Sequence, residues 1–300
     1  MDTPTIGLET ARQRLYLLPE IGGAVAAWDW KGKDGWGAIF RPWDGKAPDL
    51  YSTACFPLVP WSNRITAGGF EHGGRLHAVA PNRIDEKYPI HGDGWLQPWQ
   101  VAERTDNSVR LALESHRFAG NPWEYAATLT YTLHDDGLAI ELVATHLGDE
   151  PLPYGLGLHP YFVRNAETRL MAKTTGFYLS GDDPIPTGHT ADFPPTCDYN
   201  APATLDGPLI DNGYSGWDGR AVIGYPDRDL IVTMTMDDCK GYSLMYRPPG
   251  LPYFCYEPIT QPIDAFHMDG RPGLVELGKG QSFQLRVRFS VNETHDMPAA

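Results

Sequence analysis

The sequence predicts an all-β protein, a large antiparallel β-sandwich formed by a single domain over residues 1–300. Three observations point to this fold. Glycine and proline are frequent, with 32 and 27 residues, so the chain is interrupted too often for long helices. Many segments alternate apolar and polar residues with a period of two, and the middle of the chain lacks an amphipathic helical pattern. Short strands without intervening helices favour antiparallel sheets packed face to face.

The expected strands are distributed along the whole chain. Segments 14–18 and 24–30 flank a Pro/Gly-rich turn, and segments 126–133 and 138–145 are joined by a short polar turn typical of a hairpin. Further strands are expected at 108–115, 230–236, 242–246, 252–256 and 282–291. The irregular segments 42–60 and 181–219 are expected to be long connections that carry functional residues, and residues from about 293 to 300 a disordered tail.

The composition restricts the partners and the compartment. The net charge is -14, with 38 acidic and 24 basic residues, and the chain has no run rich in Lys and Arg. Nucleic acids and anionic membranes are therefore not expected as partners. The N-terminal segment does not resemble a secretion signal, and no stretch approaches the length of a membrane span. The four cysteines are widely separated and form no CxxC pair, which predicts reduced thiols in a cytoplasmic protein. The sequence leaves open whether the protein is a monomer or a homodimer.

One carboxylate, Glu257, occupies an unusual position in the sequence. It lies in the segment LPYFCYEPITQPIDAF, preceded by aromatic residues and followed by Pro258, so the backbone is expected to be extended there. Apolar neighbours on a pleated surface desolvate a carboxylate, raise its pKa and make it a usable general base. A glutamate on the solvated face of a strand is the alternative.

Four other polar residues stand out, and each is a weak signal alone. Arg64, in PWSNRI, could donate its planar fork to a ligand or brace a loop carbonyl. His91, before Gly92, could contact a ligand or serve the turn itself. His159, in YGLGLHPYF, lies among apolar residues that would bring its pKa near or below neutrality. Asp211, in the long connection, could accept hydrogen bonds from hydroxyls or form an Asx turn.

Taken in order, these segments resemble the aldose 1-epimerase, or galactose mutarotase-like, family. The resemblance covers most of the chain and combines six elements: SNRI with a following GxF, the HG pair at His91, Trp99 before a strand, HPYF at His159, the DN segment at Asp211, and EPxT with a downstream DAF around Glu257. Their order and spacing are more specific than any single element. The family implies a β-sandwich with an open, polar sugar cleft and a small-molecule sugar as partner.

The resemblance also implies roles for individual residues. Glu257 resembles the general base, which takes the proton from the anomeric hydroxyl, and His159 resembles the general acid, which as an imidazolium protonates the ring oxygen. The ring then opens to the aldehyde and closes to the other anomer, so one acid and one base suffice without a metal or organic cofactor. Substrate-holding positions are implied at Arg64, His91 and Asp211, with Asn63 and Tyr161 beside them.

Further residues bear on the substrate. Asp93 follows the HG pair where the related hexose-6-phosphate mutarotases have an arginine; an aspartate there would repel a phosphate, which favours an uncharged free aldose. A sulfonated or phosphorylated sugar stays open, because four basic residues could reach a charged group from elsewhere: Arg83, Arg164, Lys173 and Arg247. Trp95 and Trp99 could stack on a sugar or belong to the core.

Two other classes of function share these residues. A catalytically silent carbohydrate-binding or sensing β-sandwich would use the same cleft, although it would be expected to lack the acid or the base. A glycoside hydrolase would need two suitably spaced carboxylates, and Asp211 could be the second beside Glu257.

Overall fold

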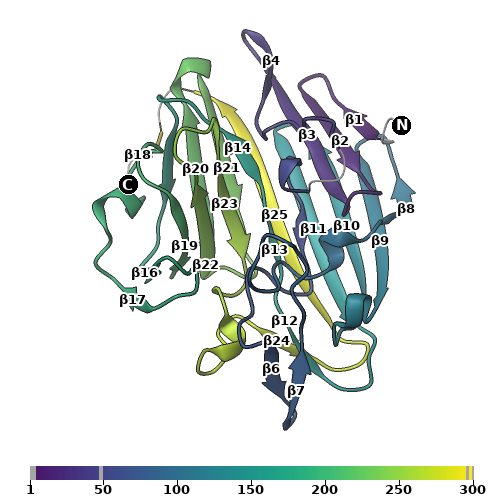
Figure 1. Ribbon diagram of the computed structural model, residues 1–300. Helices are drawn as coiled ribbons and strands as arrows, with labels where there is room; N and C mark the ends of the chain where they lie inside the picture. The colour runs from purple at the N-terminus through teal and green to yellow at the C-terminus, as the bar shows by residue number, and fades with distance from the viewer. Residues whose placement is uncertain (1–4, 47–49, 295–296, 299–300) are drawn as a thin grey trace.

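The computed structural model describes residues 5–46, 50–294 and 297–298, and it confirms the predicted all-β class (Figure 1). Among these residues the only helices are short 3₁₀ turns: η1 (Leu50–Ser52), η2 (Gly94–Leu96), η3 (Phe118–Gly120), η4 (Pro195–Cys197), η5 (Pro226–Arg228) and η6 (Ala265–His267). No helix in the described ranges is long and apolar enough to cross a membrane.

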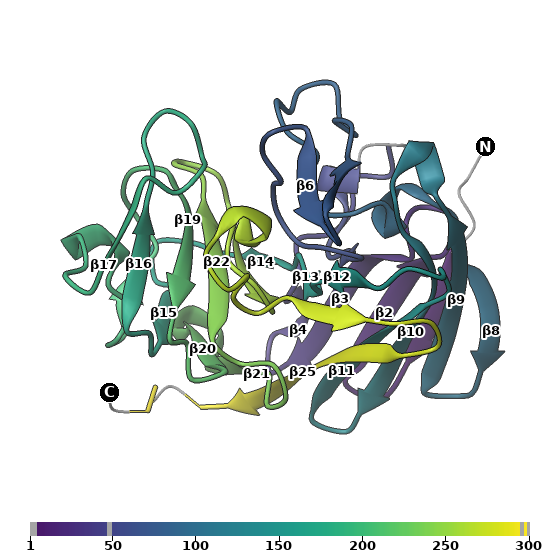
Figure 2. The ribbon, with the colours of Figure 1, turned by 90° about the horizontal axis from the view of Figure 1, so that it is seen from below.

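The largest sheet has nine antiparallel strands. Their order is β18 (Ala203–Thr204), β15 (Arg169–Ala172), β20 (Arg220–Tyr225), β21 (Leu230–Thr235), β25 (Ser282–Glu293), β11 (Gly137–His146), β10 (Glu124–His134), β9 (Ser108–His116) and β8 (Gln100–Arg104). The long strand β25 pairs with β21 on one side and with β11 on the other, so it joins the two halves of the molecule (Figures 1 and 2).

Two other sheets complete the layers. The eight-stranded sheet has the order β17 (Gly188–Thr190), β16 (Gly176–Leu179), β19 (Ile210–Ser215), β22 (Tyr242–Arg247), β23 (Tyr253–Ile259), β13 (Gly157–Leu158) and β5 (Pro57–Leu58), with β14 (Tyr161–Val163) also paired to β23. The four-stranded sheet consists of β1 (Ile6–Glu9), β2 (Gln13–Leu18), β3 (Ala24–Gly32) and β4 (Gly35–Ala38). Two small ribbons pair β6 (Gly69–His72) with β7 (Arg75–Ala78) and β12 (Leu152–Tyr154) with β24 (Val275–Leu277).

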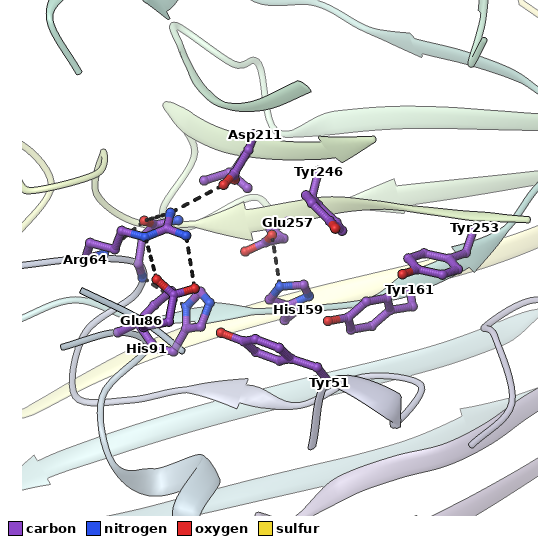
Figure 3. Close-up of a pocket in the computed structure, with 13 residues that line it drawn as sticks. Tyr51, Arg64, Glu86, His91, His159, Tyr161, Asp211, Tyr246, Tyr253 and Glu257 are labelled. Carbon is purple, nitrogen blue, oxygen red and sulfur yellow. Dashed lines mark hydrogen bonds and ion pairs between the residues drawn. The ribbon is translucent and has the colours of Figure 1, made fainter. Parts of the chain in front are cut away.

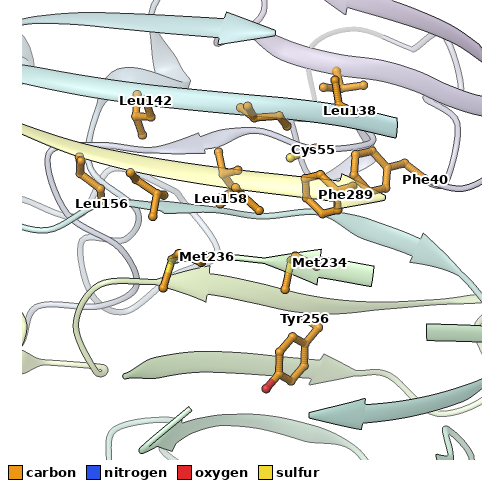
Figure 4. Close-up of a cluster of buried hydrophobic side chains, with 14 of the residues drawn as sticks. Phe40, Cys55, Leu138, Leu142, Leu156, Leu158, Met234, Met236, Tyr256 and Phe289 are labelled. Atoms are coloured by element: carbon orange, nitrogen blue, oxygen red, sulfur yellow. The ribbon is translucent and has the colours of Figure 1, made fainter. Parts of the chain in front are cut away.

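The four- and eight-stranded sheets both pack on one face of the nine-stranded sheet. Phe289 of β25 shows this directly, because its ring lies 5.8 Å from Trp28 of β3 and 6.1 Å from Phe162 of β14. Alternate residues of β25 are buried on this face, as expected for a strand with one face in a core. Figure 4 shows Phe289 among the apolar side chains between the layers. The predicted antiparallel sandwich is therefore confirmed.

The predicted strands correspond to observed ones, but the expected irregular segments are partly wrong. Segment 181–219 contains β17, β18 and β19, so Asp211 lies on a strand rather than in a loop. In the expected tail, Glu293 is the last residue of β25, and Met297 packs against a small apolar cluster of Met171, Val222 and Ile231. The rest of that tail, apart from Thr294 and Pro298, lies outside the described residues. The single domain stays a prediction.

Candidate active site

On strand β23, the side chain of Glu257 lies on the face of the sheet that points away from the main core. Phe254 and Tyr256 point into the main core, while Tyr253 and Glu257 line a pocket on the other face of the eight-stranded sheet. This division follows from the pleat, because successive side chains of a strand point to opposite faces. Glu257 is buried, as the sequence predicted, with 1% exposure, although its neighbours Phe254 and Tyr256 lie on the opposite face of the sheet.

The pocket is open to solvent. All seven residues predicted from the sequence line it: Asn63, Arg64, His91, His159, Tyr161, Asp211 and Glu257. Six residues that the sequence analysis did not single out complete the lining: Tyr51, Glu86, Ile90, Leu244, Tyr246 and Tyr253. The pocket thus brings together residues from η1, β14, β19, β22 and β23 and from the segments that follow β5, β7 and β13 (Figure 3).

His159 and Glu257 face each other at the centre of the pocket (Figure 3). His159 Nε2 lies 3.3 Å from Glu257 Oε1, and the two side chains are 8% and 2% exposed. The imidazole packs against the rings of Phe56 and Tyr161, each 4.7 Å away between centroids, which fixes its plane. The other polar atoms, His159 Nδ1 and Glu257 Oε2, are buried and have no hydrogen-bond partner within the described part of the chain. Buried polar atoms without partners are rare and are often found at sites of function.

Burial shifts both groups toward their neutral forms. It raises the pKa of Glu257 well above its ordinary value, and the nearby Asp211 carboxylate raises it further, while Arg64 opposes the shift. Burial also lowers the pKa of His159 to about 3, helped by the positive charge of Arg41. Burial therefore favours a protonated Glu257 beside a neutral His159. The imidazolium expected from the sequence is not the resting form, because burial outweighs the attraction between the two groups.

Arg64 lies at one end of the pocket between two carboxylates (Figure 3). Glu86 accepts hydrogen bonds from Arg64 Nε and Nη2, both at 3.2 Å, and Asp211 Oδ2 lies 3.5 Å from Nη1. Asn63 Oδ1 accepts from the backbone N–H of Arg64 at 2.9 Å. Burial alone would lower the pKa of Arg64, but Asp211 and Glu86 together raise it. Burial raises the pKa of Asp211, with Arg64 opposing and Glu86 adding to the shift.

The turn at His91 presents a neutral imidazole. The backbone N–H of Asn63 donates to His91 Nδ1 at 3.1 Å, so Nδ1 is the acceptor and Nε2 carries the hydrogen. Burial lowers the pKa of His91 well below its usual value, and the neighbouring His159 adds to this effect. Gly92 has φ +72, and a Cβ there would lie 2.0 Å from the carbonyl oxygen of Val59. Glycine is therefore needed for contact with the protein's own backbone rather than for approach of a ligand.

The tryptophans proposed as stacking partners belong to the interior. Trp95 is 1% exposed and packs beneath Tyr51 with the two ring planes 9° apart. Its indole N–H donates to the carbonyl of Gly92 at 2.9 Å. Trp99 is also 1% exposed and donates to the carbonyl of Gly94. The aromatic residues that line the pocket are instead tyrosines, at positions 51, 161, 246 and 253.

The argument from Asp93 against a phosphate is wrong. Asp93 is fully buried and accepts hydrogen bonds from Tyr125 at 2.6 Å, Asn121 at 2.9 Å and Gln97 at 3.1 Å, so it points away from the pocket. Burial raises the pKa of Asp93 to about 6, and these donors oppose the shift. The four basic residues named as possible contacts for a charged group are also absent from the pocket lining as the structure describes it: Arg83, Arg164, Lys173 and Arg247.

The sequence matches the aldose 1-epimerase family over residues 4–290. The chain belongs to this family. The uncharacterised protein YphB of Escherichia coli K12 is 32% identical over 263 residues, which cover 84% of this chain and 89% of that protein. The family resemblance read from the sequence motifs is therefore confirmed.

Solved structures agree with this assignment. A crystal structure from Escherichia coli K12, described as a candidate aldose 1-epimerase, superposes with a TM-score of 0.91 at 26% identity and covers 97% of this chain and 99% of that one. A GalM/aldose epimerase homologue from C. elegans has a TM-score of 0.83 at 17% identity, again covering 97% and 99% of the two chains. At 17% identity, the similarity to the C. elegans protein is evidence for the fold alone.

Proposed function

We propose that this protein is a cofactor-independent aldose 1-epimerase that interconverts the α and β anomers of a free aldose. The observation that carries the proposal is the buried pair of His159 and Glu257, whose facing atoms lie 3.3 Å apart in a pocket lined by hydrogen-bonding side chains. Family membership supports the reaction class, because aldose 1-epimerases catalyse this isomerisation.

The reaction needs one proton acceptor and one proton donor at the same time. Glu257 accepts the proton of the anomeric hydroxyl, and His159 gives a proton to the ring oxygen, so the C1–O5 bond breaks and a C1 aldehyde forms. Rotation about the C1–C2 bond exposes the other face of the carbonyl. Closure reverses both transfers, and the site regains its starting protonation state.

The resting position of the proton fits this scheme. The pair holds one exchangeable proton, which rests on Glu257, and the 3.3 Å contact between Glu257 Oε1 and His159 Nε2 lets it pass to the imidazole. This transfer creates the carboxylate and the imidazolium together, without any exchange with solvent. Substrate oxygens near the two groups would then favour the charged forms that burial disfavours.

The other polar groups can hold the remaining hydroxyls. His91 offers the Nε2–H donor, and Asp211 offers a carboxylate acceptor. The Nη1 group of Arg64 makes two long contacts, of 3.4 Å to Asn63 and 3.5 Å to Asp211. A sugar hydroxyl could replace these long contacts with shorter ones. Donors and acceptors at one end of the pocket thus suit a polyhydroxylated ligand.

The direct test is the rate of anomer equilibration. Freshly dissolved α-anomers of several free sugars, including a uronic or sulfonated one, are followed by polarimetry or proton NMR with and without the protein. We expect a faster approach to equilibrium for at least one sugar. Spontaneous rates for every sugar, with sugar contact still detected by saturation-transfer NMR, would instead support a binding module, and release of sugar from glycosides would support a hydrolase.

A further inference from the structure

We propose that Glu86 is a specificity-determining residue that restricts the pocket to uncharged sugars. This inference rests on the proposed function, since it concerns the ligand of the same pocket. Arg64 is the one lysine or arginine among the described residues that line the pocket. A lone arginine in a polar pocket would ordinarily favour a carboxylate, sulfonate or phosphate, because its planar fork matches those groups.

Glu86 already occupies the better edge of that fork. Its two oxygens accept from Arg64 Nε and Nη2 at 3.2 Å each, which is the bidentate arrangement that an anionic ligand would otherwise adopt. The remaining Nη1 faces Asp211 at 3.5 Å. One guanidinium thus serves two carboxylates, so Arg64 has no free edge to offer an anionic substituent at this end of the pocket.

The position of Glu86 is fixed by its loop. At one end of the loop, Asn82 accepts from the backbone N–H of Ile90 at 2.9 Å and donates to the carbonyl oxygens of Ile90 and Gly92 at 2.7 and 2.8 Å. At the other end, Lys87 and Tyr88 both donate to Asp183, at 2.7 and 2.8 Å. Glu86 is consequently held within the pocket wall, with its side chain only 19% exposed.

The charge of Glu86 reaches other groups of the pocket. It adds to the rise in the pKa of Asp211 and to that of Tyr51, both of which line the same space. A charge that perturbs these two groups also acts on a ligand between them. Glu86 would therefore disfavour anionic ligands in two ways, by repelling them and by pairing with Arg64. Specific binding sites use such repulsive contacts, as well as attractive ones, to reject close analogues.

The test compares neutral sugars with their uronic acids. Exchange NMR gives kcat/KM for D-galactose against D-galacturonate, and for D-glucose against D-glucuronate. We expect the wild-type protein to favour the neutral sugar, and the Glu86→Gln variant to reduce that preference by about tenfold, the effect of one unit charge acting across a partly exposed site. Glutamine keeps an oxygen that can accept from Arg64, so the substitution chiefly removes the charge.

A matched control lies one residue away. Asp85 is 59% exposed, pairs with Arg83 and does not line the pocket, so Asp85→Asn removes the same charge from the same loop. We expect this variant to keep the wild-type preference. A wild-type protein that accepts uronic acids as well as neutral sugars, or an equal effect of the two substitutions, would overturn the role of Glu86.

Failure of the proposed function can be distinguished from failure of this inference. If no sugar of either class is turned over, the epimerase proposal fails, and saturation-transfer NMR with the same sugar pairs still measures the charge preference of the pocket.

The salt dependence of the preference is a second readout. Raising NaCl from 20 to 500 mM shortens the Debye length from roughly 20 Å to about 4 Å, so the wild-type preference for neutral sugars should become smaller. The Glu86→Gln variant should respond less, and an equal response would contradict the proposal.

Discussion

Glu257→Gln is expected to stabilise the protein at neutral pH. Burial raises the pKa of Glu257 in the folded protein well above its unfolded value of 4.5. The folded state therefore keeps a proton that the unfolded chain releases. The stability linked to this proton is complete below pH 4.5 and is lost as the pH rises toward the folded pKa. Glutamine has the same shape without the proton, so the variant does not suffer this loss.

The size of the effect follows from the same linkage. Between the unfolded and folded pKa values, each pH unit costs the wild-type protein up to about 1.4 kcal/mol relative to the variant. From pH 5.5 to 7.5 the advantage of Glu257→Gln should therefore grow by up to about 2.7 kcal/mol. Burial lowers the pKa of His159 in both proteins, so its own pH dependence cancels in the difference to first order.

The assay is urea denaturation followed by tryptophan fluorescence at pH 5.5, 6.5 and 7.5. Asp85→Asn serves as the control, because its hydrogen bond from Arg83 lowers the pKa of Asp85 and leaves it ionised in both states over this range. The control should show no pH-dependent difference from the wild type. A Glu257→Gln advantage that stays constant or shrinks as the pH rises would refute the reasoning about the buried proton.

Two further results are expected. Since burial lowers the pKa of His159 to about 3, kcat/KM should stay flat from pH 7 down to pH 5, and a loss of activity centred near pH 6.5 would show an ordinary, solvated histidine instead. Gly92→Ala should lower the free energy of unfolding by about 2 kcal/mol or more, because its Cβ would meet the Val59 carbonyl oxygen at 2.0 Å and φ is +72. Denaturation midpoints check this, and an unchanged midpoint would contradict it.

The parts of the site that follow a local pattern could be predicted from the sequence. Alternation on β23 places Glu257 on the face opposite to Tyr256, and the same alternation could have identified Tyr253. Tyr246 pairs with Cys255 across β22 and β23, so finding it requires the strand register as well. Burial of His159 followed from its apolar neighbours in the sequence, and its lowered pKa agrees with that expectation.

The remaining contacts depend on distant parts of the chain. Asp93 follows the HG pair, but its direction is set by Tyr125 on β10, which no local pattern reveals. Trp95 likewise lies under Tyr51, a residue more than forty positions earlier in the chain. Glu86 was missed because it lies in an irregular loop, where neither periodicity nor turn chemistry indicates the direction of a side chain. Only the fold shows that it pairs with Arg64.

The measurement that tests the account most directly is anomer exchange catalysed by His159→Asn and Glu257→Gln. Exchange NMR between the α and β signals of the preferred sugar gives the rate, saturation transfer gives binding, and Asp85→Asn controls for changes outside the pocket. Because acid–base groups contribute about 10²–10⁴-fold, each pocket variant should lose at least about a hundredfold in rate while still binding sugar. Wild-type exchange in either variant would contradict the assignment of this pair as the proton donor and acceptor.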